Sequence, residues 1–284
     1  MDEDRFVELK DGRRLCYREY GDPKGKPVFY FHGWPASRLS GSETKTAALK
    51  LRVRIISPDR PGFGMSDYQA NRTLLAWTND VAELADSLGI KKFAVMGVSG
   101  GGPYAAACAY KIPQRITKVG IVVGLAPLNI KDLTKGISTA SRIGWENYHK
   151  FPLLRFFASW IGIVQFKYFP ALGRVVSFRS ESDKTLIKAR LKKVNFTASK
   201  EAYRQGIKGA AQELKIYTDD WGFKLKDIKA KVFLWYGAKD KNVSLKMGEY
   251  YHSQIKNSKL FVNPEGGHLF RLEYEEEILK ILSN

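Results

Sequence analysis

The chain has 284 residues, of which 44% are hydrophobic and 27% are charged. This composition excludes a disordered chain and a fibrous repeat, and it permits one large α/β unit, two smaller domains or one core with an insertion. No run of 18 or more apolar residues occurs, so we expect no membrane-spanning helix. The opening MDEDRF is acidic and no apolar stretch follows it, which argues against a secretory signal peptide.

The charge and the cysteines narrow the class of partner. The formal net charge is +18, and residues 131–200 hold 14 basic against 4 acidic residues. Such an excess can attract nucleic acid or anionic lipid, but no nucleic-acid motif accompanies it. We therefore expect a solvated basic surface and no nucleic-acid partner, with weak contact to an anionic membrane surface as the alternative. The two cysteines, Cys16 and Cys108, suit a reducing cytoplasm better than a disulfide.

The first half of the chain alternates between strand-like and helix-like segments. Helical spacing of apolar residues predicts a helix over 73–88, ended by Gly89, and an alanine-rich helix over 103–111. The last three of the β-rich runs are almost continuously apolar, which is typical of strands buried on both faces of a parallel sheet. This order indicates a mostly parallel α/β sheet. The β-rich runs are residues 6–9, 15–20, 28–31, 53–57, 93–97 and 116–123.

The alternation stops after Pro127 and resumes with a strand-like run at 232–236. The segment between them looks like a helical insertion over the sheet. Its stretch FPLLRFFASWIGIVQFKYFP, residues 151–170, is too short and too interrupted to cross a bilayer. We expect its aromatic residues to line an apolar pocket or to pack on one another, in preference to lying on a membrane. They are Trp145, Tyr148, Phe151, Phe156, Phe157, Trp160, Phe166, Tyr168, Phe169 and Phe178.

The sequence GVSGGG at 97–102 follows an apolar strand and precedes the alanine-rich helix. It places glycines two residues before and two residues after Ser99. A serine on a sharp strand-to-helix turn needs glycines there, because a Cβ would collide with the neighbouring backbone. The pattern predicts a nucleophilic serine, and a glycine-rich turn chosen only for its backbone is the alternative. Neither phosphate-binding glycine pattern is matched.

A serine nucleophile needs an adjacent base, which is normally a histidine held by a carboxylate. Four histidines are available. His149 lies in the aromatic insertion, His252 in a polar helical run and His32 directly after a strand. His268 stands in the glycine-rich loop PEGGHL after a short strand, from which it can reach across the carboxyl edge of the sheet. We predict His268 as the base, with a surface histidine of no catalytic role as the alternative.

An acid is expected at the end of another strand, and Asp240 follows the strand-like run VFLWYG. It gives the chain order serine, aspartate, histidine. Asp240 could instead cap a helix that begins near Ser244. The acid could also be one of three residues that end no clear strand, Asp219, Asp220 and Asp227.

Together these segments resemble the α/β-hydrolase fold superfamily, in its serine-nucleophile branch with a helical cap. The resemblance extends from about residue 6 to residue 280. It implies a mostly parallel, eight-stranded α/β-hydrolase sheet flanked by helices, with core residues 1–125 and 226–284 and a cap of residues 126–225 inserted after the sixth strand. The matching motifs are HGWP at 32–35, DRPGFGMSD at 59–67, GVSGGGPYA at 97–105, LWYGAKDKNV at 234–243 and EGGH at 265–268.

The resemblance also implies roles for individual residues. The backbone N–H groups of Trp34 and Gly100 would form the oxyanion hole, and His32 would brace its loop. Ser99 would attack a carbonyl, His268 would take the proton and Asp240 would stabilise the imidazolium. No metal or organic cofactor is needed for this chemistry, and the partner is a small-molecule ester or acyl compound.

Several activities fit that mechanism. We favour cleavage of a carboxylic ester with an apolar acyl or aryl group, because aromatic residues dominate the cap. A proline-iminopeptidase-like aminopeptidase, a carbon–carbon bond hydrolase, a lactonase and a thioesterase are alternatives. A non-catalytic ligand receptor or scaffold is the alternative of another class. Serine at the nucleophile position disfavours epoxide hydrolases and haloalkane dehalogenases, whose nucleophile in this superfamily is an aspartate.

Overall fold

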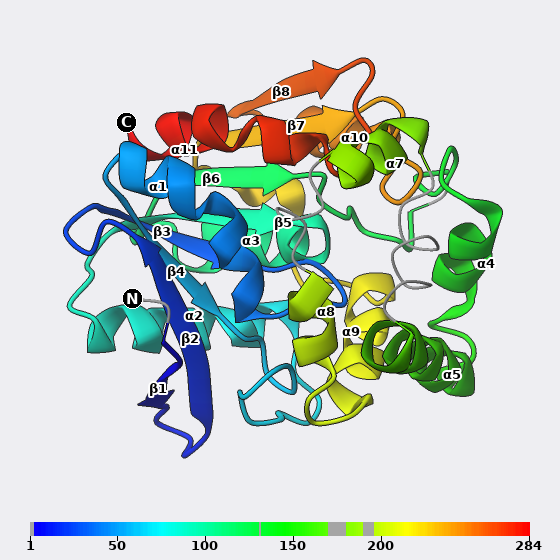
Figure 1. Cartoon of the computed structure of the whole chain (residues 1–284), viewed down its shortest axis with the longest axis horizontal. Helices are drawn as coiled ribbons and strands as arrows, with labels where there is room; N and C mark the ends of the chain where they lie inside the picture. Colours follow the sequence, from blue (N-terminus) through cyan, green and yellow to red (C-terminus); the bar gives the residue numbers. More distant parts are fainter. Residues whose placement is uncertain (1–2, 131, 170–179, 190–195) are drawn as a thin grey trace.

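The computed structural model describes residues 3–130, 132–169, 180–189 and 196–284. Its eight-stranded sheet has the order β1-β2-β4-β3-β5-β6-β7-β8 (Figure 1). β2 pairs antiparallel with β1 and β4, and the remaining neighbours are parallel. The predicted fold class is confirmed. The strands are β1 (Arg5–Glu8), β2 (Arg14–Gly21), β3 (Lys26–Phe31), β4 (Val53–Pro58), β5 (Phe93–Val98), β6 (Ile116–Val122), β7 (Val232–Gly237) and β8 (Ser258–Asn263).

The central strands are buried on both faces, as their apolar runs predict. Every residue of β5 and of β7 is buried, whereas the edge strand β8 is partly exposed along its length. Helices α2 and α3 pack on one face, and α1 and α11 pack on the other. The bounds are α1 (Lys45–Lys50), α2 (Leu74–Ser87), α3 (Gly102–Lys111), α10 (Leu245–Gln254) and α11 (Glu275–Ser283), with 3₁₀ turns η1 (Arg38–Thr44), η2 (Ser99–Gly101), η4 (Leu225–Asp227) and η5 (Phe270–Glu273).

Helix α2 illustrates why these segments fold locally. The Thr73 side chain accepts the backbone N–H of Ala76 and so caps the first turn. The helix ends before Gly89, whose φ of +66° lies in the left-handed region that glycine adopts at low cost. The predicted boundaries of 73 and 88 therefore agree with the structure to within one residue.

Helices fill the connection between β6 and β7. They lie beyond the carboxyl ends of the parallel strands, on the right of Figure 1. We keep residues 126–225 as the proposed limits of this cap. The described elements are α4 (Thr139–Asn147), α5 (Pro152–Ile163), the π-helical turn η3 (Val164–Tyr168), α7 (Glu181–Ala189), α8 (Phe196–Ala202) and α9 (Lys208–Thr218).

The expected packing of the cap aromatics is wrong for most of them. Phe178 lies outside the described residues. Of the other nine, Trp145, Tyr148 and Phe166 line a pocket. The remaining six have exposed fractions of 44% to 64%, and they are Phe151, Phe156, Phe157, Trp160, Tyr168 and Phe169.

Both cysteines are buried and free, so the expectation of unpaired thiols is confirmed. Burial raises the pKa of the Cys16 thiol to about 12 and also raises that of Cys108. Within the described residues, no helix has the length and apolar character needed to cross a membrane.

Candidate active site

Ser99 occupies the sharp turn between β5 and α3. Its φ is +53°, a left-handed conformation that is strained for a residue with a side chain. A Cβ on Gly97 would lie 2.3 Å from the carbonyl oxygen of Gly101, and one on Gly101 would lie 2.1 Å from that of Phe31. Both glycines are therefore required for the close backbone approach, which is the reason that the motif predicts.

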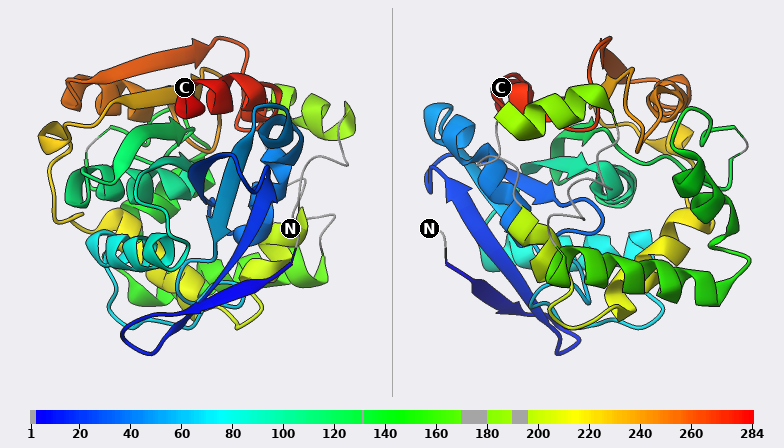
Figure 2. Two further views of the ribbon diagram at one scale, coloured as in Figure 1. Left: turned by 90° about the vertical axis from the view of Figure 1, so that its left-hand side faces the viewer. Right: turned by 45° about the vertical axis from the view of Figure 1, so that its right-hand side comes forward.

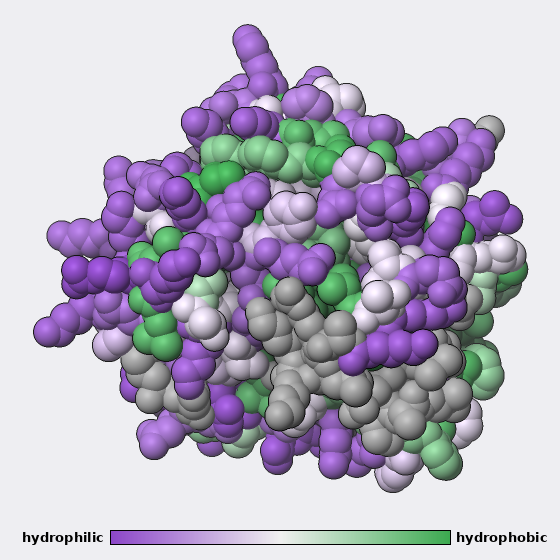
Figure 3. All heavy atoms as spheres, turned by 45° about the horizontal axis from the view of Figure 1, so that its top comes forward, coloured by the Kyte–Doolittle hydropathy of each residue, from purple (hydrophilic) through white to green (hydrophobic). Residues whose placement is uncertain are grey.

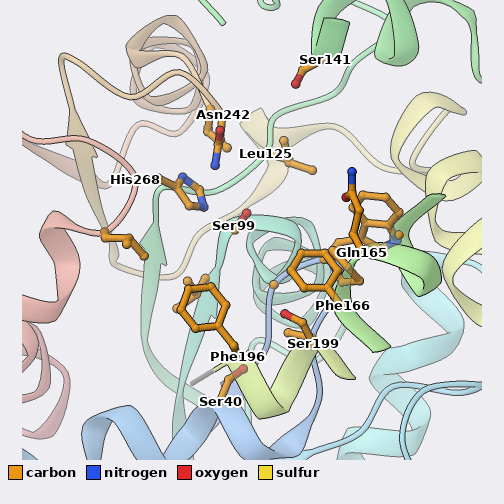
Figure 4. A pocket seen from close by; sticks show the side chains of 18 of the residues that line it. Ser40, Ser99, Leu125, Ser141, Gln165, Phe166, Phe196, Ser199, Asn242 and His268 are labelled. Carbon is orange, nitrogen blue, oxygen red and sulfur yellow. The ribbon is translucent and has the colours of Figure 1, made fainter. Parts of the chain in front are cut away.

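His268 and Asp240 meet beyond the ends of β8 and β7. His268 Nδ1 donates to Asp240 Oδ2 over 2.7 Å. The other carboxylate oxygen of Asp240 accepts the backbone N–H groups of Asn242, at 2.7 Å, and Val243, at 3.0 Å. These bonds fix the buried carboxylate and, through it, the orientation of the imidazole. Figure 4 shows the ring of His268 directed toward Ser99.

The other aspartates considered as the acid have different contacts. Asp219 pairs with Lys215, and Asp220 accepts the backbone N–H of Gly222 at 2.6 Å. Asp227 lies in the 3₁₀ turn η4. The hydrogen bond to His268 therefore singles out Asp240 among the four candidates.

The predicted oxyanion-hole residues are neighbours. A Cβ on Gly100 would lie 3.1 Å from the Cβ of Trp34, and one on Gly33 would lie 3.3 Å from the Cβ of Ser99. The Trp34 indole N–H donates to the carbonyl of Ala210 over 3.1 Å, so helix α9 fixes that side chain. Both backbone segments thus converge beside the Ser99 turn.

His32 is fully buried beneath this loop. Its Nδ1 is 2.8 Å from the Gly33 carbonyl oxygen, and its Nε2 accepts the Arg60 backbone N–H at 3.3 Å. Burial and the nearby Arg60 guanidinium lower the pKa of His32 well below its usual value. A neutral histidine with both ring nitrogens engaged acts as a brace, as the resemblance implies.

A buried charge network under the loop has no counterpart in the sequence-based predictions. Arg60 donates to the carbonyls of His32 and Gly33 and pairs with Glu213 of α9, with 2.9 Å between Nη2 and Oε2. Arg72 Nη2 donates to Glu213 Oε1 over 2.8 Å. Burial raises the pKa of Glu213, but the attraction of Arg60 and Arg72 outweighs it and lowers that pKa to about 2. One detectable signal existed, because Glu213 shares a helix face with Ala210 and Tyr217.

A second unpredicted carboxylate holds the histidine loop. Asp183 of α7 accepts the backbone N–H of His268 at 3.0 Å and that of Leu269 at 2.7 Å. It also accepts the Ser180 hydroxyl at 2.6 Å, and it is buried. A helix of the insertion therefore contacts the same loop that carries His268.

A cavity of about 510 Å³ lies over Ser99 and His268 (Figure 4). Its volume is in the range of small-molecule sites. Core residues such as Leu125 form one part of its lining, and cap residues such as Phe166 and Phe196 form another. Glu43 also lines it and is paired with Arg271 over 2.7 Å.

Comparison with known proteins agrees with this geometry. The model of the alpha/beta hydrolase fold family matches residues 26–273. The chain belongs to the α/β-hydrolase family.

Relatives in the family carry diverse names. The chain is 32% identical over 130 residues to a non-heme chloroperoxidase of Streptomyces lividans, a match that covers 45% of this chain and 47% of that protein. A proline iminopeptidase of Xylella fastidiosa is 31% identical over 49% of the chain and 46% of its own length. The chain thus spans about half the length of these relatives. A 2-hydroxymuconate semialdehyde hydrolase of Pseudomonas putida is 24% identical over 97% of the chain and 92% of its own length.

Solved structures share the fold of this hydrolase. An esterase from Exiguobacterium antarcticum superposes with a TM-score of 0.73 at 19% identity, over 99% of this chain and 100% of that one. A bromoperoxidase from Bacillus anthracis gives a TM-score of 0.74 at 21% identity, over 99% and 98% of the two chains.

Proposed function

We propose that the protein is a serine hydrolase that cleaves carboxylic esters through an acyl-enzyme on Ser99. Ser99 Oγ attacks the carbonyl carbon while His268 accepts its proton, and Asp240 stabilises the imidazolium. The backbone N–H groups of Trp34 and Gly100 stabilise the oxyanion, a contribution of roughly 3 to 4 kcal/mol for one donor. His268 then protonates the leaving alcohol, and water releases the acyl group with His268 again as the base.

One observation carries this proposal. A serine at positive φ on a strand-to-helix turn faces a histidine whose other ring nitrogen donates to a buried carboxylate. This arrangement activates a hydroxyl, because the base is held near its proton and in one tautomer. A turn selected only for its backbone would need neither the histidine nor the aspartate.

The cavity supports an ester with an apolar acyl or aryl group. Aromatic side chains from α4, η3 and α8, namely Trp145, Phe166 and Phe196, lie around the opening above Ser99. Such walls bind apolar groups by excluding water from them. The mixed lining leaves the acyl length open to measurement.

An aminopeptidase needs an acidic group that can bind a free substrate amine. Among the described residues that line the cavity, Glu43 is the acidic one, and Arg271 already pairs with it. This pairing favours the esterase over the aminopeptidase. A carbon–carbon bond hydrolase, a lactonase and a non-catalytic receptor are separated from it by assay.

The first experiment labels the protein with a fluorescent fluorophosphonate. We expect the wild-type protein to be labelled and Ser99→Ala to be unlabelled, because only an activated serine reacts rapidly with this reagent. p-Nitrophenyl esters of increasing acyl length then measure the depth of the pocket, and prolyl p-nitroanilide tests the peptidase.

A matched control is Ser87→Ala, which changes a serine at the end of α2 that bonds its own helix over 2.8 Å. It should leave labelling unchanged. Labelling of Ser99→Ala, or none of a folded wild-type protein, would contradict the proposal. The second result would favour the receptor.

A further inference from the structure

Helix α5 has its large apolar residues on the outside. Leu153 is 82% exposed, Phe157 is 56% exposed and Trp160 is 54% exposed. Phe156, at 44%, completes this set, which we call the α5 outer surface. The four lie at positions i, i+3, i+4 and i+7, so they share one face of the helix.

The opposite face of α5 is small and polar. Arg155 and Ser159 are buried, and Arg155 donates to the carbonyl of Tyr148 over 2.6 Å. A Cβ on Gly162 would lie 2.0 Å from the Tyr203 hydroxyl, so the helix packs closely there. A surface helix of a globular protein ordinarily buries its apolar face. The reversed pattern indicates that the outer surface meets an apolar environment.

The rest of the visible surface makes this helix unusual. Most of the face in Figure 3 is hydrophilic, with hydrophobic residues in separate small groups. Figure 2 shows α5 at the periphery of the molecule. Clustered exposed apolar side chains at the edge of a fold typically mark an interaction site.

Charge selects the occupant. Between Glu146 and Glu181 the sequence has five basic residues and no acidic one. Lys167 lies 5.7 Å from the ring centre of Tyr168, which is 64% exposed. In the groove beside α9, Arg155, Lys208 and Lys215 outnumber Asp219 and Asp220, and Asp219 pairs with Lys215.

We propose that the α5 outer surface docks on an anionic lipid bilayer. An amphipathic helix with Trp, Phe and Leu on one side and lysines at its margin inserts at the boundary of headgroups and acyl chains. Anionic headgroups attract the lysines. A second copy of the chain would bring the same positive charge to the contact, which disfavours a dimer through this face.

Docking would place the proposed active site beside the bilayer. Ala158 and Gly162 of α5 line the cavity that contains Ser99. The lipid surface then lies about one helix diameter, roughly 10 Å, from that cavity. The substrate class becomes esters dissolved in the membrane. This consequence rests on the proposed function, whereas the docking does not.

Cosedimentation of the full chain with sucrose-loaded vesicles tests the docking. We expect binding to phosphatidylcholine vesicles that contain one third phosphatidylserine and little binding to phosphatidylcholine alone. Raising the ionic strength from about 0.1 M to about 1 M shortens the screening length from about 10 Å to about 3 Å and should release the protein. The same assay with Ser99→Ala separates docking from catalysis.

Variants locate the contact. Leu153→Ser with Phe157→Ser should lower the partition coefficient about tenfold or more, because both apolar side chains leave the interface. Leu49→Ser, at a position 52% exposed on α1, is the matched control. Lys150→Gln with Lys167→Gln should weaken binding to anionic vesicles, and Lys92→Gln on another surface should not. Hydrolysis of a short soluble ester should be unchanged in all of these variants.

Three outcomes would overturn the docking. They are equal recovery of the wild-type protein with neutral and anionic vesicles, unchanged binding of the Leu153/Phe157 variant, and a dimer that this variant dissociates in light scattering. The last result would assign the face to a second copy of the chain. A protein that docks but fails to label with fluorophosphonate would refute the proposed function alone.

Discussion

Glu213 is a single buried side chain on which two parts of the site depend. It neutralises Arg60 and Arg72, and Arg60 in turn holds the carbonyls of the loop that carries Trp34. Its second oxygen accepts the hydroxyl of Tyr217 at 2.7 Å, and a Cβ on Gly100 would lie 2.4 Å from that hydroxyl. Removing the negative charge would leave two buried guanidinium groups without compensation.

Glu213→Gln should therefore destabilise the protein by about 3 to 5 kcal/mol near pH 7. The pKa of Glu213 is lowered from 4.5 to about 2 in the folded state, so its ionisation stabilises the fold fully above about pH 4.5. That stabilisation is lost as the pH falls toward 2. The difference between wild type and variant should consequently shrink over this range.

Urea unfolding of both proteins at neutral pH and at about pH 3 measures this difference. Glu249→Gln, at an exposed position of α10, serves as the control for the loss of a charge. A loss that is the same at both pH values would show that the charge of Glu213 is not the stabilising feature.

At the level of elements, helix α7 positions the histidine loop. Asp183 accepts two consecutive backbone N–H groups, those of His268 and Leu269. Carboxylate oxygens bind such groups more strongly than neutral acceptors do. Since the imidazole is attached to this backbone, the carboxylate fixes where the proposed base stands without touching the substrate.

Asp183→Asn should lower kcat about ten- to a hundredfold with little change in KM, because a shift of about 1 Å in a reacting group can cost about 10²-fold in rate. The amide NH₂ cannot accept a backbone N–H, so one of the two bonds is lost. Steady-state kinetics with a short ester measure the effect. Glu181→Gln, exposed on the same helix, is the control. A rise in KM alone would assign Asp183 to substrate binding.

The strands and helices of the core could be predicted because their signals are local. The glycines around Ser99 and the cap at Thr73 act within a few residues, and the structure places both as expected. Asp183 and Glu213 escaped prediction because their partners lie far away in sequence. The direction of α5 escaped it because periodicity identifies an apolar face without identifying what that face meets.

At the level of the whole molecule, the site is assembled at one edge of the sheet. Ser99 follows β5, Asp240 follows β7 and His268 follows β8. β8 is an edge strand that pairs with β7 alone and is partly exposed along its length. Local opening begins where buried contacts are few, so β8 should separate before the central strands do.

Heating should therefore abolish esterase activity at a lower temperature than it abolishes helical structure. Activity after brief heating and the far-UV circular dichroism of the same sample give the two midpoints. Coincident midpoints would mean that β8 opens only with the rest of the sheet.

The heat tolerance of the enzyme is then a property of one strand. Substitutions that stabilise the sheet around β2 and β4 would raise the Tm without prolonging activity. Engineering for durability would have to begin at β8 and at the loop that Asp183 holds.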